Sequence, residues 1–230
     1  METKMIEYVR PDGQTANSYY VTPWGDRKGP GVVVMQEWWG LNAQIKAVAD
    51  RLGQAGYRAM VPDLFRGKVA KNRNEATHLM SGLDWDDAVD QDLRGAVQHL
   101  RNVSDGAVGV MGFCMGGALT LIAGTRLSGI DAGVCFYGIP PAAKADPSRL
   151  RAPMQFHFAH DDDWCTPESV DELERALRRG SASFEVFRYD AKHAFMNEAR
   201  PEVYDAGASA KAWERMLHFL LAKLAQGDGA

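Results

Sequence analysis

The chain has 230 residues, 46% of them hydrophobic and 24% charged, which are the proportions of a globular protein rather than a disordered or fibrous one. The net charge of −4, with basic residues dispersed among acidic ones, gives no electrostatic reason to expect nucleic acid or an anionic membrane as a partner. The length suits one well-buried domain over residues 1–230, and no repeat or linker divides it.

The first part of the chain predicts strands and one helix. Two strands are expected around residues 5–9 and 18–21, with a turn signal between them. The continuous apolar run at 31–35 is typical of a strand buried on both faces. A capped amphipathic helix over 42–56 and a short strand over 57–61 follow.

From there on, helices and strands alternate regularly. The expected elements are a helix over 84–103, a strand over 107–111, a helix over 115–127, strands over 130–137 and 154–158, a helix over 166–179, a strand over 183–189 and a helix over 203–225. Such alternation implies right-handed crossovers and a doubly wound, mostly parallel sheet with helices on both faces. In these sheets ligands bind at the carboxyl ends of the strands.

The N-terminus and the hydrophobic runs bear on location. Glu2 and Lys4 come too early for the apolar core of a signal peptide. No apolar run approaches the ~18 residues that a membrane-spanning helix needs. We therefore expect a cytoplasmic protein. We also expect it to be a monomer or a small homo-oligomer.

The three cysteines, Cys114, Cys135 and Cys165, fit neither a disulfide framework nor a structural zinc site. Their number is odd, and no two of them are closely spaced in the sequence. Each is therefore a core residue or a reactive thiol. Local context has to decide between the two.

For Cys114 the context is the turn Gly112-Phe113-Cys114-Met115-Gly116-Gly117, between a predicted strand and a predicted helix. This is the setting of a nucleophile elbow, with cysteine as its central residue. Side chains on the flanking glycines would collide with backbone, and the thiol would face the N-terminus of the helix, which favours a thiolate. We expect Cys114 to be a nucleophile and the N–H of Met115 to stabilise an oxyanion. The alternative is a buried cysteine in a packing turn.

A thiol nucleophile needs a base. The candidates are His78, His99, His157, His160, His193 and His218. His99 and His218 fall in predicted helices, and His157 lies within a predicted strand. His193 follows the last predicted strand and so comes to the same sheet edge as Cys114, which makes it the expected base.

The base needs a carboxylate to orient it, and the segment after strand 154–158 reads Ala159-His160-Asp161-Asp162-Asp163-Trp164. We expect Asp162 to serve, with Asp161 as the alternative. Three carboxylates beside a histidine could instead bind a metal, but such sites usually draw ligands from several segments. The order nucleophile, acid, histidine is that of α/β-hydrolases.

The loop after the strand at 31–35 reads Gln36-Glu37-Trp38-Trp39-Gly40-Leu41-Asn42. In this topology it supplies a second oxyanion N–H, which points to Trp38. Glu37 can accept the proton of Cys114 or be kept protonated by apolar surroundings. The alternative for Glu37 is a solvated loop residue.

Together these motifs resemble the dienelactone hydrolase (carboxymethylenebutenolidase) family of α/β-hydrolases. The likeness extends from Gln36-Glu37-Trp38-Trp39-Gly40 through the elbow to His193-Ala194-Phe195. It implies a Cys114–His193–Asp162 triad, an oxyanion hole from the amides of Trp38 and Met115, and Glu37 as the partner of the resting thiol, displaced when substrate binds. It also implies hydrolysis of a small lactone or ester through an acyl-thioester.

Two other functions fit the same motifs. One is an ester or thioester hydrolase of this mechanism without dienelactone activity. The other is a non-catalytic thiol sensor or binding protein on the same fold, in which Cys114 would be oxidised reversibly.

The family resemblance also indicates which residues bind substrate. Arginines grip the substrate carboxylate in the family, and the comparable positions here are Asn197, with Arg200 farther on, and Arg73, beside which Thr77 replaces a family tyrosine.

The remaining expectations concern the shape and lining of the pocket. Only a short loop separates strands 130–137 and 154–158, so we expect no large lid domain. Aromatic residues at strand ends predict a planar or apolar acyl part: Trp38, Trp39, Phe113, Tyr137, Trp164 and Phe195. No phosphate loop or dinucleotide fingerprint is present, so we expect a small-molecule substrate and no organic cofactor.

Overall fold

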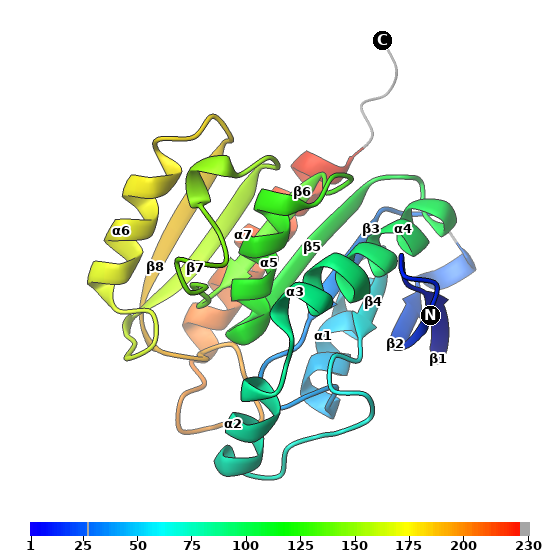
Figure 1. Cartoon of the computed structure of the whole chain (residues 1–230), viewed down its shortest axis with the longest axis horizontal. Coiled ribbons are helices and arrows are strands. Elements are labelled where there is room, and N and C mark those ends of the chain that lie inside the picture. Colours follow the sequence, from blue (N-terminus) through cyan, green and yellow to red (C-terminus); the bar gives the residue numbers. More distant parts are fainter. Residues whose placement is uncertain (27, 226–230) are drawn as a thin grey trace.

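The computed structural model describes residues 1–26 and 28–225, and one eight-stranded β-sheet runs through it (Figure 1). The strands lie in the order β1-β2-β4-β3-β5-β6-β7-β8. The pairs β1–β2 and β2–β4 are antiparallel, and all other neighbouring pairs are parallel. The predicted mostly parallel, doubly wound sheet is confirmed.

Every predicted strand is present. The strands are β1 (Glu2–Val9), β2 (Thr15–Thr22), β3 (Gly31–Met35), β4 (Arg58–Pro62), β5 (Val108–Phe113), β6 (Ala132–Phe136), β7 (Met154–Asp161) and β8 (Phe184–Lys192). The strands β3 to β6 are buried along their whole length. The sequences of β3, β5 and β6 are continuous apolar runs, as expected of strands buried on both faces, whereas β4 begins with the buried Arg58. The strand β7 extends past its predicted end at residue 158 to Asp161.

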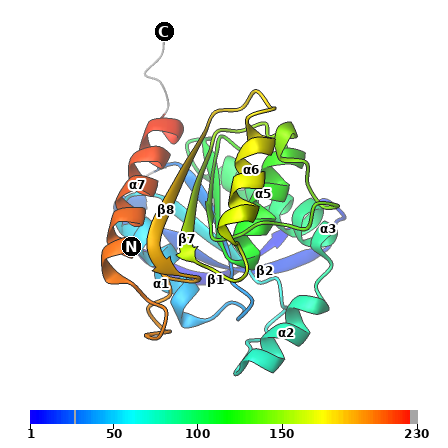
Figure 2. The ribbon, with the colours of Figure 1, turned by 90° about the vertical axis from the view of Figure 1, so that its left-hand side faces the viewer.

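Helices cover both faces of the sheet (Figure 2). The longer ones are α1 (Ala43–Gln54), α4 (Arg94–Val103), α5 (Met115–Arg126), α6 (Pro167–Leu177) and α7 (Ala206–Leu224), and two short 3-10 helices are η1 (Trp24–Asp26) and η3 (Pro147–Arg149). The helices α1 and α7 pack on one face, and α4, α5 and α6 pack on the other. Among the described residues, no helix is both long enough and apolar enough to cross a membrane.

The hydrophobic core is divided by the sheet. In β3, Val32 and Val34 join the cluster that contains α1 and α7, whereas Val33 and Met35 join the cluster with α4 and α5. This division follows from strand geometry, because successive side chains point to opposite faces. Both faces of the sheet are therefore covered by hydrophobic side chains. Polar loops follow the parallel strands at the carboxyl edge, which is where a ligand can bind.

The helix α2 (Arg73–Ser81) was not predicted from the sequence. It stands at the carboxyl edge of the sheet, apart from the two helical layers (Figures 1 and 2). Asn72 caps it by accepting the backbone N–H of Glu75 at 3.0 Å, and the Glu75 carboxylate accepts the N–H of Lys71 at 2.9 Å. An Asn followed three residues later by Glu is a sequence pattern that can predict the start of a helix, and here it marks the start of α2. The helix buries only Ala76, so no apolar stripe marks it.

The predicted helix over 84–103 is present but irregular. It consists of α3 (Trp85–Asp87), the π-helical segment η2 (Ala88–Leu93) and α4. In the wider π-turns the carbonyl of Asp92 accepts the hydroxyl of Tyr8 at 3.0 Å. The predicted helix is therefore confirmed, and its π-helical part η2 is the place where groups from distant segments bind the chain.

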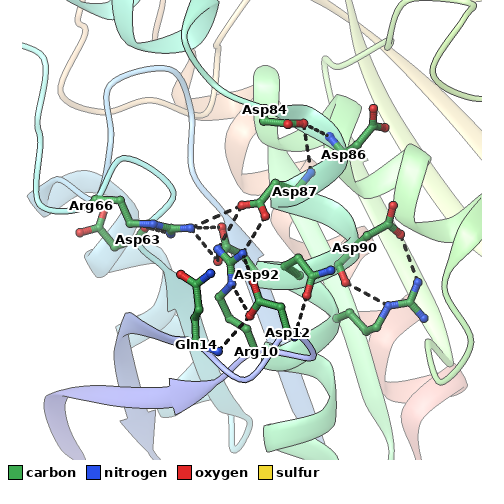
Figure 3. A network of polar contacts seen from close by, with 12 residues as sticks. Arg10, Asp12, Gln14, Asp63, Arg66, Asp84, Asp86, Asp87, Asp90 and Asp92 are labelled. Atoms are coloured by element: carbon green, nitrogen blue, oxygen red, sulfur yellow. Dashed lines mark hydrogen bonds and ion pairs between the residues drawn. The ribbon is translucent and has the colours of Figure 1, made fainter.

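A network of charged side chains surrounds η2 (Figure 3). Arg10, just after β1, donates to Asp92 at 3.1 Å and to Asp87 at 2.7 Å. Arg66, in the loop after β4, donates to both oxygens of Asp92 at 2.9 and 3.0 Å. The network links the β1–β2 hairpin and the loop between β4 and α2 to η2. It therefore holds in place the start of the loop that leads to α2 at the carboxyl edge.

Candidate active site

The turn between β5 and α5 has the geometry of a nucleophile elbow. Cys114 has φ 54° and ψ −117°, a strained conformation for a residue with a side chain. A Cβ on Gly112 would collide with the backbone of Gly116, and one on Gly116 would collide with the carbonyl of Met35. The steric role predicted for the two glycines is confirmed. They let α5 start directly behind β5 and β3 while the thiol points outward.

The thiol of Cys114 is half-buried and lines a cavity of about 510 Å³. Met115, which also lines this cavity, is the first residue of α5, and the first N–H groups of a helix have no partner within it. Trp38, from the loop after β3, contributes to the same wall. The structure thus brings the nucleophile candidate and both predicted oxyanion residues to one cavity.

His193 and Asp162 form a hydrogen-bonded pair beside Cys114. His193 directly follows β8, and its Nδ1 lies 2.8 Å from Asp162 Oδ2. The second oxygen, Oδ1, accepts the backbone N–H groups of Trp164 and Cys165, each at 2.8 Å. Since the side chain of Asp162 is completely buried and all its contacts come from fixed groups, it holds the imidazole in one orientation.

The neighbouring carboxylates point elsewhere. Asp161 is the last residue of β7, where the pairing with β8 shifts register, and both Asp161 and Asp163 are exposed at the cavity. The backbone carbonyl of Asp161 accepts the N–H of His193 at 3.2 Å, so it orients the loop rather than the ring. Among the described residues, no group of three or more His, Cys, Asp or Glu side chains is gathered as a metal site would require.

The electrostatics of the pair favour a charged imidazole. Burial disfavours the charged form, but the hydrogen bond with Asp162 and the adjacent sulfur of Cys114 raise the pKa of His193 to about 10. Burial also opposes ionisation of Asp162, yet the hydrogen bond with His193 and two backbone N–H groups lower the pKa of this carboxyl. The raised pKa of His193 and the lowered pKa of Asp162 together favour an imidazolium held by a carboxylate.

Glu37 lies in the cavity wall, but its partners are not those expected. It is 3% exposed, so the alternative of a solvated loop residue is wrong. Its Oε2 accepts the side-chain amide of Asn197 at 2.6 Å, and its Oε1 accepts the hydroxyl of Tyr137 at 3.3 Å. Burial raises the pKa of Glu37, against the effect of the Asn197 amide and the positive charges of His193 and Arg200.

The rest of the cavity has charged and apolar walls. The charged residues are Arg73, Asp161, Asp163, Lys192 and Arg200, and the apolar ones include Met80, Trp85, Ala118, Ile139 and Val203. The predicted Arg73, Tyr137, Trp164 and Arg200 are all in the lining. Met80 and Trp85 were missed because the segment that carries them, from α2 to α3, has no recognisable sheet-edge position in the sequence.

Four residues predicted to bind substrate do not line the cavity. Phe113 and Phe195 are fully buried in the core, where Phe113 stacks on Phe136 with ring centroids 4.7 Å apart. Trp39 packs behind Trp38 at 5.4 Å, and Asn197 binds Glu37. Phe113 and Phe195 stand near strand ends but are buried in the core, whereas Trp39 is half-buried and its ring faces Arg200 at 5.8 Å.

The chain is similar to known proteins over nearly its whole length. A family model described as "Dienelactone hydrolase family" matches residues 16–224. "Protein usf" of Aquifex pyrophilus is 36% identical over 94% of this chain and 96% of its own length, and a "Putative carboxymethylenebutenolidase" of Aquifex aeolicus is 30% identical over the same shares. The crystal structure of a "Putative Dienelactone Hydrolase" from Klebsiella pneumoniae superposes with a TM-score of 0.83 at 25% identity, covering 98% of this chain and 100% of that one.

The matches agree with the eight-stranded, mostly parallel sheet and with the absence of a large lid domain in the described part of the chain. The chain therefore belongs to the dienelactone hydrolase family of α/β-hydrolases and is a carboxylic ester hydrolase.

Proposed function

We propose that the protein hydrolyses a small lactone or ester with Cys114 as nucleophile, His193 as general base and acid, and Asp162 as the group that orients His193. The observation that carries this proposal is the single cavity shared by the elbow cysteine and a histidine held by a buried aspartate at 2.8 Å. The matches to the dienelactone hydrolase family support ester or lactone hydrolysis as the reaction.

The first half of the reaction acylates the enzyme. The thiolate of Cys114 attacks the carbonyl carbon, and the carbonyl π electrons move to the oxygen, where the N–H groups of Met115 and Trp38 stabilise the charge. The intermediate collapses, the bond to the leaving oxygen breaks, and the imidazolium of His193 gives its proton to that oxygen. The product is an acyl-thioester on Cys114.

The second half regenerates the enzyme. His193, now neutral, removes a proton from a water molecule as the water attacks the thioester carbonyl. Collapse of this second intermediate breaks the carbon–sulfur bond and releases a carboxylic acid. The thiolate of Cys114 then stands again beside the imidazolium of His193.

The lining of the cavity favours a substrate that is partly apolar and carries a carboxylate. Arg73 and Arg200 enter the cavity from α2 and from the turn before α7, and arginine pairs well with carboxylates. Arg200 also bonds Glu202 at 2.9 Å, which leaves Arg73 as the more available cation. The volume of about 510 Å³ suits a compact molecule.

The test is ultraviolet-monitored hydrolysis of cis- and trans-dienelactone, with p-nitrophenyl acetate in parallel and the Cys114→Ala variant as the blank. We expect Cys114→Ala to reduce turnover to the rate measured without enzyme, while its circular dichroism and thermal unfolding match those of the parent. Turnover that survives in Cys114→Ala would overturn the assignment of the nucleophile.

The substrates divide the outcomes further. Rapid loss of dienelactone would support a carboxylated lactone, and Arg73→Ala should then raise KM. Hydrolysis of the acetate alone would retain the mechanism and reject dienelactone as substrate. If neither reacts above the blank, the sensor or binding function is favoured.

A further inference from the structure

Trp85 lies between the active-site cavity and the hydrophobic core. Its side chain lines the cavity that contains Cys114, and it also packs against the hydrophobic cluster with α4 and α5. Met115 and Ala118, near the start of α5, line the same cavity. An indole ring in this position fills space that a substrate could otherwise occupy.

The helix that carries Trp85 is packed more loosely at its start than at its end. The single turn α3 has no fully buried side chain, whereas η2, into which it continues, is buried from Ala88 onward. The side chain of Asp84 caps α3 by accepting the N–H groups of Asp86 and Asp87 at 3.0 and 3.1 Å (Figure 3). The less packed end is therefore the one that carries Trp85.

Asp86, the next residue, binds this end to two other segments. Its Oδ1 accepts Nη1 of Arg126 at 2.6 Å, and its Oδ2 accepts Nζ of Lys144 at 2.7 Å. Nη2 of Arg126 also donates to the backbone carbonyl of Lys144 at 2.6 Å, so the three residues are bonded to one another. The cations of Lys144 and Arg126 lower the pKa of the Asp86 carboxyl, which favours its charged form.

The two cations belong to elements that build the rest of the cavity. Arg126 is the last residue of α5, the helix that begins directly after Cys114. Lys144 lies in the loop after β6, and Ile139 of the same loop lines the cavity. The bonded side chains are partly exposed, and such ion pairs stabilise a fold only weakly. Their geometric effect is to link the end of α3 that carries Trp85 to the elbow helix and to the cavity loop.

We propose that Trp85 is a specificity-determining residue that limits the length of the apolar group of the substrate, and that Asp86, Arg126 and Lys144 are positioning residues that hold it in the cavity wall. The inference rests on the proposed function, because it assumes that the substrate reacts at Cys114. It adds a substrate class to that function, namely esters or lactones whose apolar part is short. A long unbranched chain would have to displace the indole ring from the position that Asp86 holds.

The experiment measures kcat/KM for p-nitrophenyl acetate, butyrate, hexanoate and octanoate, and compares the hexanoate-to-acetate ratio between variants. The parent should prefer the short esters. Trp85→Ala should raise the ratio by about tenfold, because the acyl chain gains the space of the indole ring. Trp85→Phe should raise it less, and it provides the test if Trp85→Ala does not fold. A ratio that is unchanged or lower in both variants would overturn the proposal.

A variant of Asp86 tests the positioning role. Asp86→Asn keeps the shape and loses the charge, and it should raise the ratio by about threefold through a lower KM for the hexanoate. Asp171→Asn is the matched control, because Asp171 is 54% exposed against 51% for Asp86 and bonds Arg188 at 2.6 Å. Neither Asp171 nor Arg188 lines the cavity, so this control should keep the parent ratio. Equal ratios in Asp86→Asn and Asp171→Asn would overturn the positioning role.

A double variant shows whether Asp86 acts through Trp85. Trp85→Ala combined with Asp86→Asn should give the same ratio as Trp85→Ala alone, because no indole ring remains to be positioned. A ratio that is the product of the two single effects would show that Asp86 acts independently of Trp85, and it would overturn the positioning role.

Alkylation of Cys114 tests the same wall without turnover. The rates with N-ethylmaleimide and N-hexylmaleimide are followed by peptide mass analysis, with Cys114→Ala as the background. The hexyl-to-ethyl ratio should rise in Trp85→Ala and, less, in Asp86→Asn. If the parent hydrolyses no ester, the proposed function fails, and this ratio still decides the inference. A rise supports the role of Trp85, and an equal ratio in parent and variants overturns it.

Discussion

Two buried carboxylates in this protein are held in opposite ways. Asp92, in η2, is 1% exposed and contacts two arginines, Arg10 at 3.1 Å and Arg66 at 2.9 Å (Figure 3). Glu37, at the carboxyl edge, is 3% exposed and contacts only the neutral donors Asn197 and Tyr137 through hydrogen bonds.

The difference separates a structural site from a reactive one. Burial raises the pKa of Asp92, against the hydrogen bond and charge of Arg66 and the charge of Arg10, and this carboxylate links the segments that supply the two arginines. A buried carboxylate with neutral donors has a raised pKa and stays sensitive to nearby charge. The first carboxylate lies away from the cavity and the second lines it, so position and partners, rather than a raised pKa alone, distinguish the reactive site from the structural one.

The largest expected effect tests which carboxylate serves His193. Asp162→Asn should lower kcat by about 10⁴-fold, because an amide cannot stabilise the imidazolium and favours the wrong tautomer. Asp161→Asn is the matched control and should change kcat only slightly, since that side chain is exposed. Steady-state hydrolysis of p-nitrophenyl acetate measures both. The reverse ranking would contradict the contact between His193 and Asp162.

The second effect tests the structural carboxylate. Asp92→Asn should destabilise the fold by about 3 kcal/mol, because Arg10 and Arg66 lose their shared buried partner. Urea unfolding measures the change, and the remaining folded enzyme should keep its kcat.

The control for Asp92 is Asp90→Asn in the same segment. Asp90 forms a partly exposed pair with Arg94, so its loss should change the free energy of unfolding by less than about 1 kcal/mol. Equal effects of the two substitutions would show that the buried network does not stabilise the fold.

The smallest effect concerns the pH dependence that Glu37 contributes. Its pKa is raised above the ordinary value of 4.5, so the folded state binds the proton more tightly than the unfolded state. The associated stability is present below about pH 4.5 and is lost as pH rises through the folded pKa, by at most about 1.4 kcal/mol per pH unit.

The measurement is urea unfolding of the parent and of Glu37→Gln at several pH values. The stability of the parent relative to Glu37→Gln should fall as pH rises above about 4.5. A constant or rising difference would show that Glu37 is not held in a site that favours its protonated form.

Much of the fold could be predicted because its elements have local causes. The buried strands β3 and β5 are continuous apolar runs, and Asn42 caps α1 with a bond of 3.1 Å to the N–H of Ile45. The helix α2 was not predicted, because it buries only Ala76 and has no apolar stripe. The helix that contains η2 was predicted, but its π-helical form was not, because Tyr8, Arg10 and Arg66 bind η2 from distant segments.

The same division applies to the site. Cys114, His193 and the acidic segment Asp161–Asp163 could be placed from the strands that precede them, since the topology brings the ends of parallel strands together. The partners of Glu37 could not, because Asn197 is 160 residues away and Tyr137 is 100 residues away in the sequence. Position at a strand end also does not say which way a side chain points, and so Phe113 and Phe195 were expected in the cavity.

By itself, the sequence determined the order of the elements, the cysteine elbow and the family, since each depends on spacing within a short segment. Only the tertiary structure decided that Asp162 rather than Asp161 meets His193, that Glu37 is held by Asn197 and Tyr137, and that Met80 and Trp85 form part of the cavity wall. Side-chain direction and long-range hydrogen bonds are settled when distant segments pack together, and no local pattern encodes them.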